Sequence, residues 1–505
     1  MLRYVLPLLP AAYGCATSIE SVDVPRTVTR SLPAETESPL GRLFVPAPDE
    51  ESLFAPVDHG GDGLDLRLGL AHYATSSIDV QSYLWHPDAC GAYLLDALFE
   101  AADRGVRVRL LIDGFRLEPT RDHAAALALH PNVEIRVFNP TYHRGGVWEI
   151  VELVENLDRL DHRMHNKLFL VDGVAAVFGG RNVGDEYFGL SDERNMRDFD
   201  LFASGRVVEE LATSFDDFWN SRWSIPVMDL STDEGVEAEL LTGVRERLTS
   251  AHESEPRLDA RRSIPPEGWF AALERARSQM VHGRARVLHD VHEIEQKGAT
   301  GVLAQAFVEA LGETRGDVVL VSAYLVPNAE LLQSIRRHTE AGERVLILTN
   351  SYASTNQPLA HTFYAEARRD LIEAGAELYE MRADAWSHAH HRLPNSLASS
   401  LCLHTKSGVF GPEHVLVGSM NLDPRSMDLN TELGVLVESA DLAARIRGLL
   451  LREFADRNAW RVTVDADGDL VWSSQGTVHR DEPDLPTSEA IREWFVRLLP
   501  VRGEV

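Results

Sequence analysis

The sequence predicts an α/β protein built from two similar halves that are related by a pseudo-twofold axis, with the active site at their interface. The first observation is a repeated motif, because His165-Asn166-Lys167 recurs as His404-Thr405-Lys406. The same spacing leads from each histidine to a second string, Gly179-Gly180-Arg181-Asn182 in one copy and Gly418-Ser419-Met420-Asn421 in the other. The second observation is that strand-like and helix-like runs alternate in both halves. This favours mixed, largely parallel sheets covered by helices on both faces.

Matching elements can be named in the two halves. In the first half, residue periodicity predicts a strand over 78–83, a helix over 93–104 and a strand over 106–112. The second half repeats this order over 318–324, 329–339 and 344–348. Each helix is followed by a glycine, Gly105 or Gly342, which is typical of a helix C-terminus.

These patterns divide the chain into six segments. They are a lipoprotein-type signal over 1–15, a tether over 16–64, a first domain over 65–225 with its motif at 159–186, a helical connector over 226–290, a second domain over 291–465 with its motif at 398–425, and a C-terminal extension over 466–505. The tether is rich in Pro, Ser, Thr, Asp and Glu and has little periodicity. The extension contains an amphipathic helix predicted over 488–499, whose apolar face is expected to pack on the body.

The composition is that of a large acidic protein. The chain has 505 residues, 44% of them hydrophobic, with a formal net charge of −29 and a pI near 5.1. This length allows two domain-sized cores. The negative charge disfavours nucleic acid as a partner, because phosphate backbones bind basic surfaces. No transmembrane helix is expected, and Cys90 and Cys402 are interpreted as buried thiols.

The N-terminus resembles a bacterial lipoprotein signal. Arg3 precedes an apolar run over 4–13, and small residues lead to Cys15. We therefore expect Cys15 to be lipidated and to hold this acidic chain at a membrane surface of the bacterial cell envelope. The alternative is an N-terminus that is not processed.

The repeated His and Lys residues indicate phosphodiester chemistry. At the two-residue period of a strand, His165 and Lys167 face the same way, as do His404 and Lys406. One imidazole is suited to attack phosphorus, the other to protonate the leaving oxygen, and the two ammonium groups to hold the negative charge. A catalytic metal is rejected, because a lysine beside each histidine is a poor neighbour for a cation. No cofactor is expected.

Other polar residues are expected to support this pocket. Asn182 and Asn421 follow glycines at strand ends and are expected to donate hydrogen bonds to phosphate oxygens, with help from Ser419. Asp200 and Glu432 are assigned to matching places in the repeats, where a carboxylate bonded to imidazole Nδ1 fixes the tautomer and supports the cation. The alternative for both acids is a solvated strand end.

These residues resemble the duplicated His-x-Lys-x4-Asp motif of the phospholipase D superfamily. Longer strings are similar to its cardiolipin synthase C branch: Arg163-Met164-His165-Asn166-Lys167, Gly179-Gly180-Arg181-Asn182-Val183-Gly184-Asp185-Glu186-Tyr187-Phe188, Asn421-Leu422-Asp423-Pro424-Arg425-Ser426, Gln81-Ser82-Tyr83-Leu84-Trp85 and Asn430-Thr431-Glu432. The resemblance runs from about residue 65 to the C-terminus. It implies two phospholipase D-like αβα sandwich domains.

The family pattern counts Asp172 among the catalytic residues and has an aspartate where this chain has Gly411. Asp172 lies at odd parity from His165, so it is predicted to point away from the attacking face and to brace a turn. For the same reason Gly411 need not abolish activity.

The resemblance implies a phosphatidyltransferase that works through a covalent phosphohistidine, with His165 as nucleophile and His404 as general acid/base. The implied substrates are phosphatidylglycerol and, as donor, phosphatidylethanolamine or a second phosphatidylglycerol, and the product is cardiolipin. Two alternatives stay open. One is a hydrolytic phospholipase D or phosphodiesterase using the same site, and the other is a catalytically weakened lipid-binding envelope protein.

Two further groups of residues are of interest. His388, His390 and His391 lie in a loop-like segment and are interpreted as a flexible polar lid, with metal binding as the alternative. Tyr83, Trp85 and Tyr324 lie at the ends of matched strands, where they are suited to line an acyl or headgroup groove.

Overall fold

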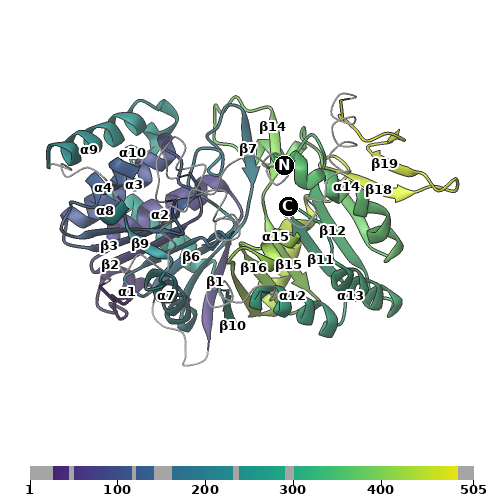
Figure 1. The fold of residues 1–505 in the computed structure, drawn as a ribbon, viewed down its shortest axis with the longest axis horizontal. Coiled ribbons are helices and arrows are strands. Elements are labelled where there is room, and N and C mark those ends of the chain that lie inside the picture. The colour runs from purple at the N-terminus through teal and green to yellow at the C-terminus, as the bar shows by residue number, and fades with distance from the viewer. Residues whose placement is uncertain are drawn as a thin grey trace, which may run out of the picture.

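The computed structural model describes residues 27–44, 51–116, 121–141, 162–230, 238–290 and 301–486. Two halves of like topology lie side by side, the first in purple to teal and the second in green to yellow (Figure 1). Cys15 and the helix predicted over 488–499 lie outside the described residues. Within the described ranges, no helix combines the length and the apolar character needed to cross a bilayer.

The sheet of the first half has eight strands. Their order across the sheet is β9 (Ser224–Pro226), β4 (Val133–Phe138), β3 (Arg107–Asp113), β2 (Ser77–Ser82), β5 (Leu168–Val171), β6 (Ala175–Gly179), β8 (Asp200–Gly205) and β1 (Ser52–Val57). Strands β2, β3 and β4 are parallel, and the other pairings are antiparallel. The sheet is mixed, as expected, but only two of its seven strand pairings are parallel, so it is not largely parallel.

The second half repeats this order strand for strand. It runs β18 (Ala459–Val464), β13 (Glu377–Met381), β12 (Val345–Asn350), β11 (Val318–Ser322), β15 (Lys406–Phe410), β16 (His414–Gly418), β17 (Leu433–Glu438) and β10 (Val281–His289). Beyond β18 the hairpin of β19 (Leu470–Ser474) and β20 (Thr477–His479) extends the outer edge.

Strands β1 and β10 occupy matching places and pair with each other, which joins the halves into one eighteen-stranded sheet. This pairing corrects two predicted segments. The tether over 16–64 is wrong for its described part, because residues 27–44 contact the body and β1 is a buried strand of the first sheet. The connector over 226–290 is wrong at its end, because β10 belongs to the sheet of the second half.

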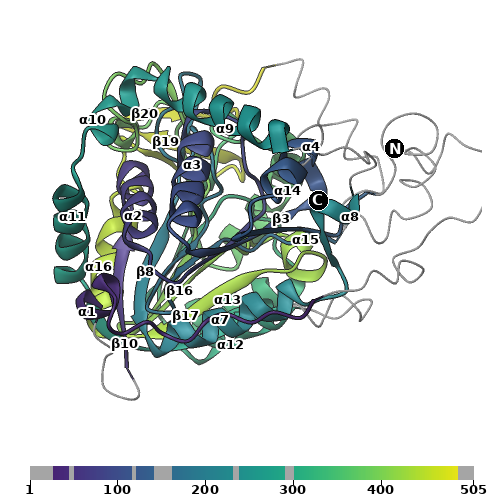
Figure 2. The same ribbon diagram turned by 90° about the vertical axis from the view of Figure 1, so that its left-hand side faces the viewer.

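Helices cover both faces of the sheet. Those of the first half are α1 (Pro39–Leu43), α2 (Gly60–Tyr73), α3 (Ala89–Asp103), α4 (Arg121–Leu127) and α7 (Arg206–Trp219); α8 (Val227–Leu230), α9 (Ala238–Glu253), α10 (Asp259–Arg262) and α11 (Pro266–Ser278) follow, and α12 (Val302–Glu313), α13 (Ala329–Glu340), α14 (Pro358–Glu373), α15 (Pro424–Asp428) and α16 (Ala440–Leu451) belong to the second half. Short 3-10 turns lie at Gly114–Arg116, Pro256–Leu258 and Trp386–Ala389. Figure 2 looks onto α2, α3, α9 and α11, on the outer side of the first half.

The inner helices bind the halves together. In α7, Val207, Leu211, Phe215 and Trp219 recur every four residues and are buried, so one stripe of the helix faces the sheet. Helix α7 of the first half packs on β10, and α16 of the second half packs on β1. One hydrophobic core therefore contains side chains of both halves.

A small second sheet crosses between the halves at the top of Figure 1. Strand β7 (Arg194–Arg197) of the first half pairs in parallel with β14 (Ser400–Leu403) of the second, and Arg197 is the partner of Leu403. The residues that follow these strands are Asp198 and His404, so this pairing brings the two side chains to the same place.

Candidate active site

The two histidines lie on backbone segments that cross from one half to the other. His165 N donates to the carbonyl of Thr431 at 2.9 Å, and Thr431 N donates back to Arg163 at 2.8 Å. In the other copy, His404 N donates to the carbonyl of Arg197 at 2.8 Å. Backbone hydrogen bonds between the halves therefore fix both imidazoles.

Each imidazole is paired with a carboxylate of the opposite half. Nδ1 of His165 lies 3.0 and 3.1 Å from the two carboxylate oxygens of Glu432. Nδ1 of His404 lies 2.6 Å from Oδ2 of Asp198. All four side chains are buried. A carboxylate at Nδ1 selects the tautomer with its proton there, which leaves Nε2 of each ring for chemistry.

The predicted contact with an imidazole Nδ1 is therefore present for Glu432, whereas the prediction for Asp200 is wrong. Asp200 lies 3.0 Å from Arg67 and 3.2 Å from Arg181 in a buried ion pair cluster, and neither imidazole is among its described partners. The residue matching Glu432 is Asp198, because Gly179 pairs with Asp200 where Gly418 pairs with Gly434. Asp198 and Asp200 are two positions apart on an extended segment and therefore lie on the same face. Strand periodicity alone cannot decide which of them contacts the histidine.

The two acids differ in length, and the facing residue differs with them. Ser419 Oγ donates to Glu432 and accepts from Leu433 N at 3.0 Å. At the matching place in the first half, a Cβ on Gly180 would overlap the carboxylate of Asp198. Ser419 thus supports the site through Glu432, and Gly180 leaves room for the shorter acid.

Both lysines are buried beside the histidines. Nζ of Lys167 donates to the carbonyl of His165 at 2.5 Å, and Nζ of Lys406 donates to the carbonyl of His404. Each ammonium also lies over a tyrosine ring, Lys167 at 5.2 Å from Tyr83 and Lys406 at 5.9 Å from Tyr324.

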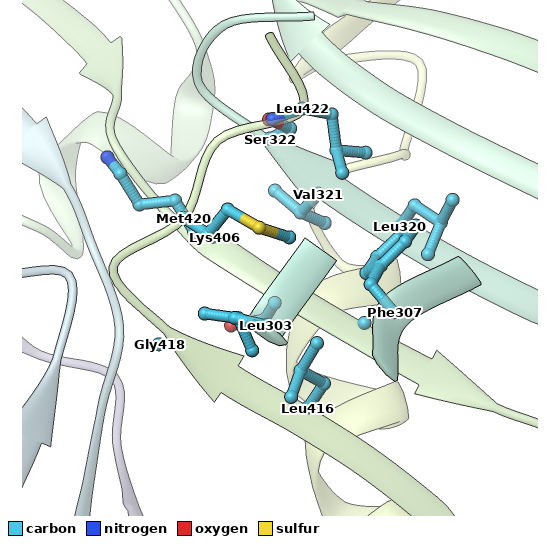
Figure 3. Close-up of a pocket in the computed structure, with 12 residues that line it drawn as sticks. Leu303, Phe307, Leu320, Val321, Ser322, Lys406, Leu416, Gly418, Met420 and Leu422 are labelled. Atoms are coloured by element: carbon cyan, nitrogen blue, oxygen red, sulfur yellow. The ribbon is translucent and has the colours of Figure 1, made fainter. Parts of the chain in front are cut away.

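The surroundings of the lysines explain their electrostatics. Figure 3 shows the stem of Lys406 beside Met420, in a pocket lined mainly by apolar side chains of α12, β11 and β16, with the amine directed away from it. Burial disfavours the charged form and lowers the pKa of Lys406 to about 8 and that of Lys167 to about 7. An anion entering the site would therefore raise the pKa of both amines and favour their charged form.

Burial also shifts the pKa values in the two histidine–carboxylate dyads, His165–Glu432 and His404–Asp198. It lowers the pKa of His404 to about 3 and holds the pKa of His165 well below its usual range, with the neighbouring lysines adding to both effects. Burial raises the pKa of Glu432 to about 7. For Asp198 burial is outweighed by His404, Lys406 and Arg181, so its pKa lies below the usual value. The two carboxylates thus make the same contact with Nδ1, but their pKa values are shifted in opposite directions.

The predicted asparagines behave differently from each other. Nδ2 of Asn182 donates to the hydroxyl of Tyr187 at 3.0 Å, and its Oδ1 accepts from Leu84 N at 3.3 Å. The ring of Tyr187 meets the ring of His404 edge-on at 5.2 Å, so Asn182 positions an aromatic neighbour of the histidine. The buried Oδ1 of Asn421 has no hydrogen-bond partner among the described residues.

Two aromatic residues frame the histidines. Tyr83 meets the ring of His165 edge-on at 5.0 Å, as Tyr187 meets that of His404. The sequence predicts a groove-lining role for Tyr83, whereas Tyr187 carries no predicted role. The position of Tyr187 in the string that follows Asn182 is the signal that could have found it.

Asp172 is not part of the reacting centre. Its carboxylate accepts hydrogen bonds of 2.8 to 3.1 Å from the backbone N–H groups of Thr75, Ser76 and Ser77. These residues lie at the start of β2, whereas the catalytic groups lie beyond its other end. The residue has a φ of 52°, and Gly411 at the matching turn has a φ of 58°. Asp172 braces a turn in a conformation for which glycine is well suited.

The histidine segment is no flexible lid. His388 and His391 are buried, and Nε2 of His391 lies 3.1 Å from Glu453. Burial alone would raise the pKa of Glu453, but the hydrogen bond with His391 and the charge of Arg197 lower it to about 2. Arg197 also pairs with Asp58 at 2.6 Å. This cluster fixes the end of β7, directly before Asp198.

Comparisons with known proteins agree with this geometry. The family model described as "Cardiolipin synthase, PLD-like domain" matches residues 69–219 and 307–453. Cardiolipin synthase C of Escherichia coli K12 is 32% identical, covering 90% of this chain and 96% of the relative. An uncharacterized protein of Helicobacter pylori is 29% identical and covers 92% of each chain. The crystal structure of phosphatidylserine synthase from Haemophilus influenzae has a TM-score of 0.60 at 13% identity, covering 93% of this chain and 100% of that one, which is a likeness of fold.

The predicted fold class, two phospholipase D-like domains, is confirmed, and so is the predicted class of enzyme, a phosphatidyltransferase of the phospholipase D type. The repeated family match coincides with the two halves of the sheet. The chain belongs to the cardiolipin synthase, phospholipase D-like domain family.

Proposed function

We propose that this protein transfers a phosphatidyl group between glycerophospholipids through a phosphohistidine and makes cardiolipin from phosphatidylglycerol. The observation that carries the proposal is the pair of buried imidazoles, each held at Nδ1 by a carboxylate of the opposite half and flanked by a buried lysine. A phosphodiester bound between the rings has an Nε2 atom on each side. That is the arrangement needed for in-line displacement followed by its reverse.

In the first step, Nε2 of His165 attacks phosphorus, and the bond from phosphorus to the leaving alcohol oxygen breaks. The negative charge of the bound phosphodiester favours the imidazolium form of His404, which gives its Nε2 proton to that oxygen and becomes neutral. In the second step, the hydroxyl of an acceptor lipid attacks phosphorus, its proton passes to His404, and the bond to His165 breaks. Lys167 and Lys406 stabilise the charge on the non-bridging oxygens.

The assignment of the two histidines rests on their acids. Asp198 lies 2.6 Å from His404 and its pKa is held below the usual value, so an ionised carboxylate supports the imidazolium that the acid/base residue becomes. Glu432 shares its carboxylate with Ser419, and burial raises its pKa to about 7. His165 therefore sits beside a weaker counter-charge, which suits a neutral nucleophile.

The substrate class follows from the relatives. The name of cardiolipin synthase C supports cardiolipin as the product. We propose phosphatidylglycerol as acceptor and phosphatidylethanolamine or a second phosphatidylglycerol as donor, as the sequence resemblance implies. We place the protein at a membrane of the bacterial cell envelope, with a lipidated Cys15 as its anchor. The burial of both histidines favours an alcohol acceptor over water, because a dry site slows hydrolysis.

Hydrolysis by the same two steps, with water as acceptor, is the second candidate. The test is to incubate the purified protein with labelled phosphatidylglycerol, with and without phosphatidylethanolamine, and to analyse the lipid products. We expect labelled cardiolipin in both mixtures, and free glycerol or ethanolamine as the co-product. Phosphatidic acid as the sole lipid product would overturn the transferase assignment, and the absence of any product would favour a lipid-binding role.

A further inference from the structure

The first half contains a deep apolar cavity outside the reacting centre. It has a volume of about 290 Å³ and lies between α3, α4 and α9 and the end of β3. Figure 2 shows these elements together, and α9 packs on both α3 and α4. Small-molecule sites in proteins begin at about 300 Å³ and are mostly apolar, so the cavity has the size of a ligand site.

The interior of the cavity is suited to a hydrocarbon chain. Its depth is lined by aliphatic side chains such as Leu95, Leu110, Ile112, Ile135 and Val244. Among the described residues that line it, none is an aspartate or a glutamate, in a chain whose net charge is −29. The polar residues His123 and Arg247 are exposed and lie at the rim. Such a cavity admits an apolar chain and tolerates an anionic group at its mouth.

The cavity is close to the reacting centre along the chain. Trp85 and His86 form part of its wall, and Tyr83, whose ring lies 5.0 Å from that of His165, precedes Trp85 by two residues. Two residues span at most about 7 Å. Ile112 in the floor directly precedes Asp113, whose carboxylate holds Met164 N beside His165 at 2.8 Å.

One lipid chain is long enough to extend from His165 to the cavity wall at Trp85, because the ring of Tyr83 lies 5.0 Å from that of His165 and two residues span at most about 7 Å. A bilayer has a hydrocarbon core of about 30 Å, so a single chain covers about 15 Å of it. A phospholipid whose phosphate lies at His165 therefore has the reach to put one acyl chain into the cavity.

The equivalent space in the described part of the second half is almost closed. At the corresponding place, beside Leu325 and Asn350, the cavity measures about 10 Å³, and Tyr364 and His361 of α14 are among the residues that line it. In the first half the wall is completed by α9, which follows the first sheet in the chain. The cavity is thus a property of the first half and not a packing defect repeated with the fold.

We propose that this cavity holds one acyl chain of the phospholipid that reacts at His165. The inference rests on the proposed function and adds a selectivity for chain length. The lipid bound with its chain in the first half is the one whose phosphate His165 attacks, which assigns the cavity to the donor lipid.

The first experiment measures kcat/KM for phosphatidylglycerol with long and with short acyl chains, presented in detergent. Ala92→Phe fills the interior, Ala251→Trp narrows the mouth, and Ser250→Trp is the matched control, because Ser250 is the exposed neighbour of Ala251 that does not line the cavity. We expect the ratio of long-chain to short-chain kcat/KM to fall about tenfold or more in both cavity variants and to stay unchanged in the control. An unchanged ratio in folded cavity variants would overturn the inference.

The second experiment measures binding without turnover. Phosphatidylglycerol with a brominated acyl chain should quench the fluorescence of Trp85, so the wild type should lose more emission than Trp85→Phe. Equal quenching in the two proteins would refute the acyl site, whatever Ala92→Phe does to folding. Quenching at Trp85 in a protein that yields no phosphatidyl product would support the acyl site and refute the proposed function. Product formation without chain-length selectivity would support the proposed function and refute the acyl site.

Discussion

Oδ2 of Asp198 lies 2.6 Å from Nδ1 of His404, although the two residues belong to opposite halves of the chain. Glu432 reaches His165 across the same boundary in the other direction. Neither half therefore contains a complete dyad.

Replacing Asp198 tests this relationship. Asp198→Asn should lower kcat about a hundredfold or more, because an amide in place of the carboxylate no longer supports the His404 cation. Some thermal stability should also be lost, because the charge of the buried Asp198 is favoured by Lys406 and Arg181, so kcat is compared per folded molecule. Activity close to wild type would show that His404 does not depend on Asp198.

Asp200→Asn is the matched comparison, two residues away. It leaves the guanidinium groups of Arg67 and Arg181 without their buried counter-charge. We expect a loss of about 3–5 kcal/mol in the free energy of unfolding, with kcat retained in the folded protein. Denaturant unfolding and steady-state rates on both variants separate the two roles, and a variant of normal stability with a lost kcat would reverse them.

A covalent adduct would show which of the two histidines is the nucleophile and which is the general acid/base. His165→Ala should form neither adduct nor product, because the nucleophile is gone. His404→Ala should lose turnover but still be labelled by a phosphodiester whose leaving group needs no proton. Mass spectrometry of the labelled peptide locates the phosphoryl group, and a phosphohistidine on His404 of the wild type would exchange the assignments.

Gly411→Asp restores the residue of the family pattern at the second turn. We expect activity to change less than about tenfold, because the turn lies away from the imidazoles. A Cβ at this position would overlap the carbonyl of Arg315, whereas backbone N–H groups face Asp172 in the first copy. The variant should therefore lose about 1–3 kcal/mol of stability. A gain in rate of several orders of magnitude would instead mark the natural protein as a weakened enzyme.

The free energy of unfolding should carry a signature of Glu432. Burial raises its pKa from 4.5 to about 7, so the folded protein keeps a proton that the unfolded chain releases in this range. The stability contributed by the group is therefore present below pH 4.5 and is lost as the pH rises to about 7. Glu432→Gln lacks this titration. The stability of the wild type relative to the variant should fall by on the order of 3 kcal/mol across the window, and parallel curves in urea would contradict the shifted pKa.

Cys15→Ser tests the proposed anchor. In the native host the variant should remain unprocessed or unacylated, and activity on membranes should fall while activity on detergent-dispersed lipid persists. Acyl chains on Cys15 would hold so acidic a protein beside an anionic bilayer. A variant that fractionates with membranes as firmly as the wild type and migrates at the same size would exclude the lipoprotein anchor.

The sequence was sufficient for the groups that lie within one motif. His165, Lys167, His404 and Lys406 have the strand parity that places each pair on one face, and the structure brings them together with Glu432. The contact of Asp198 with His404 was not predicted from the sequence, because Asp200, on the same face, matches the repeat equally well. The choice between them depends on the register of β8 against β6, which is a pairing distant in sequence.

Two further features, the strand β1 and the ion pairs around His391, were not predicted from the sequence for a related reason. Ser52–Val57 has a proline and flanking acidic residues, and its strand conformation is fixed by pairing with β8 and β10. From its local sequence, His391 is interpreted as a polar loop residue. Its buried position depends on Glu453, which pairs with both His391 and Arg197. Partners far along the chain decide such structures, and local composition does not.

The pairing of β1 with β10 has a mechanical consequence. Backbone hydrogen bonds run without a break from the outer edge of one half to the outer edge of the other. A hinge motion between the two halves would have to break the β1–β10 pairing and split the shared core beneath it, so such a motion is energetically costly. Under the proposed function, substrates would then enter and leave by movements of side chains, while each histidine stays beside the carboxylate of the opposite half.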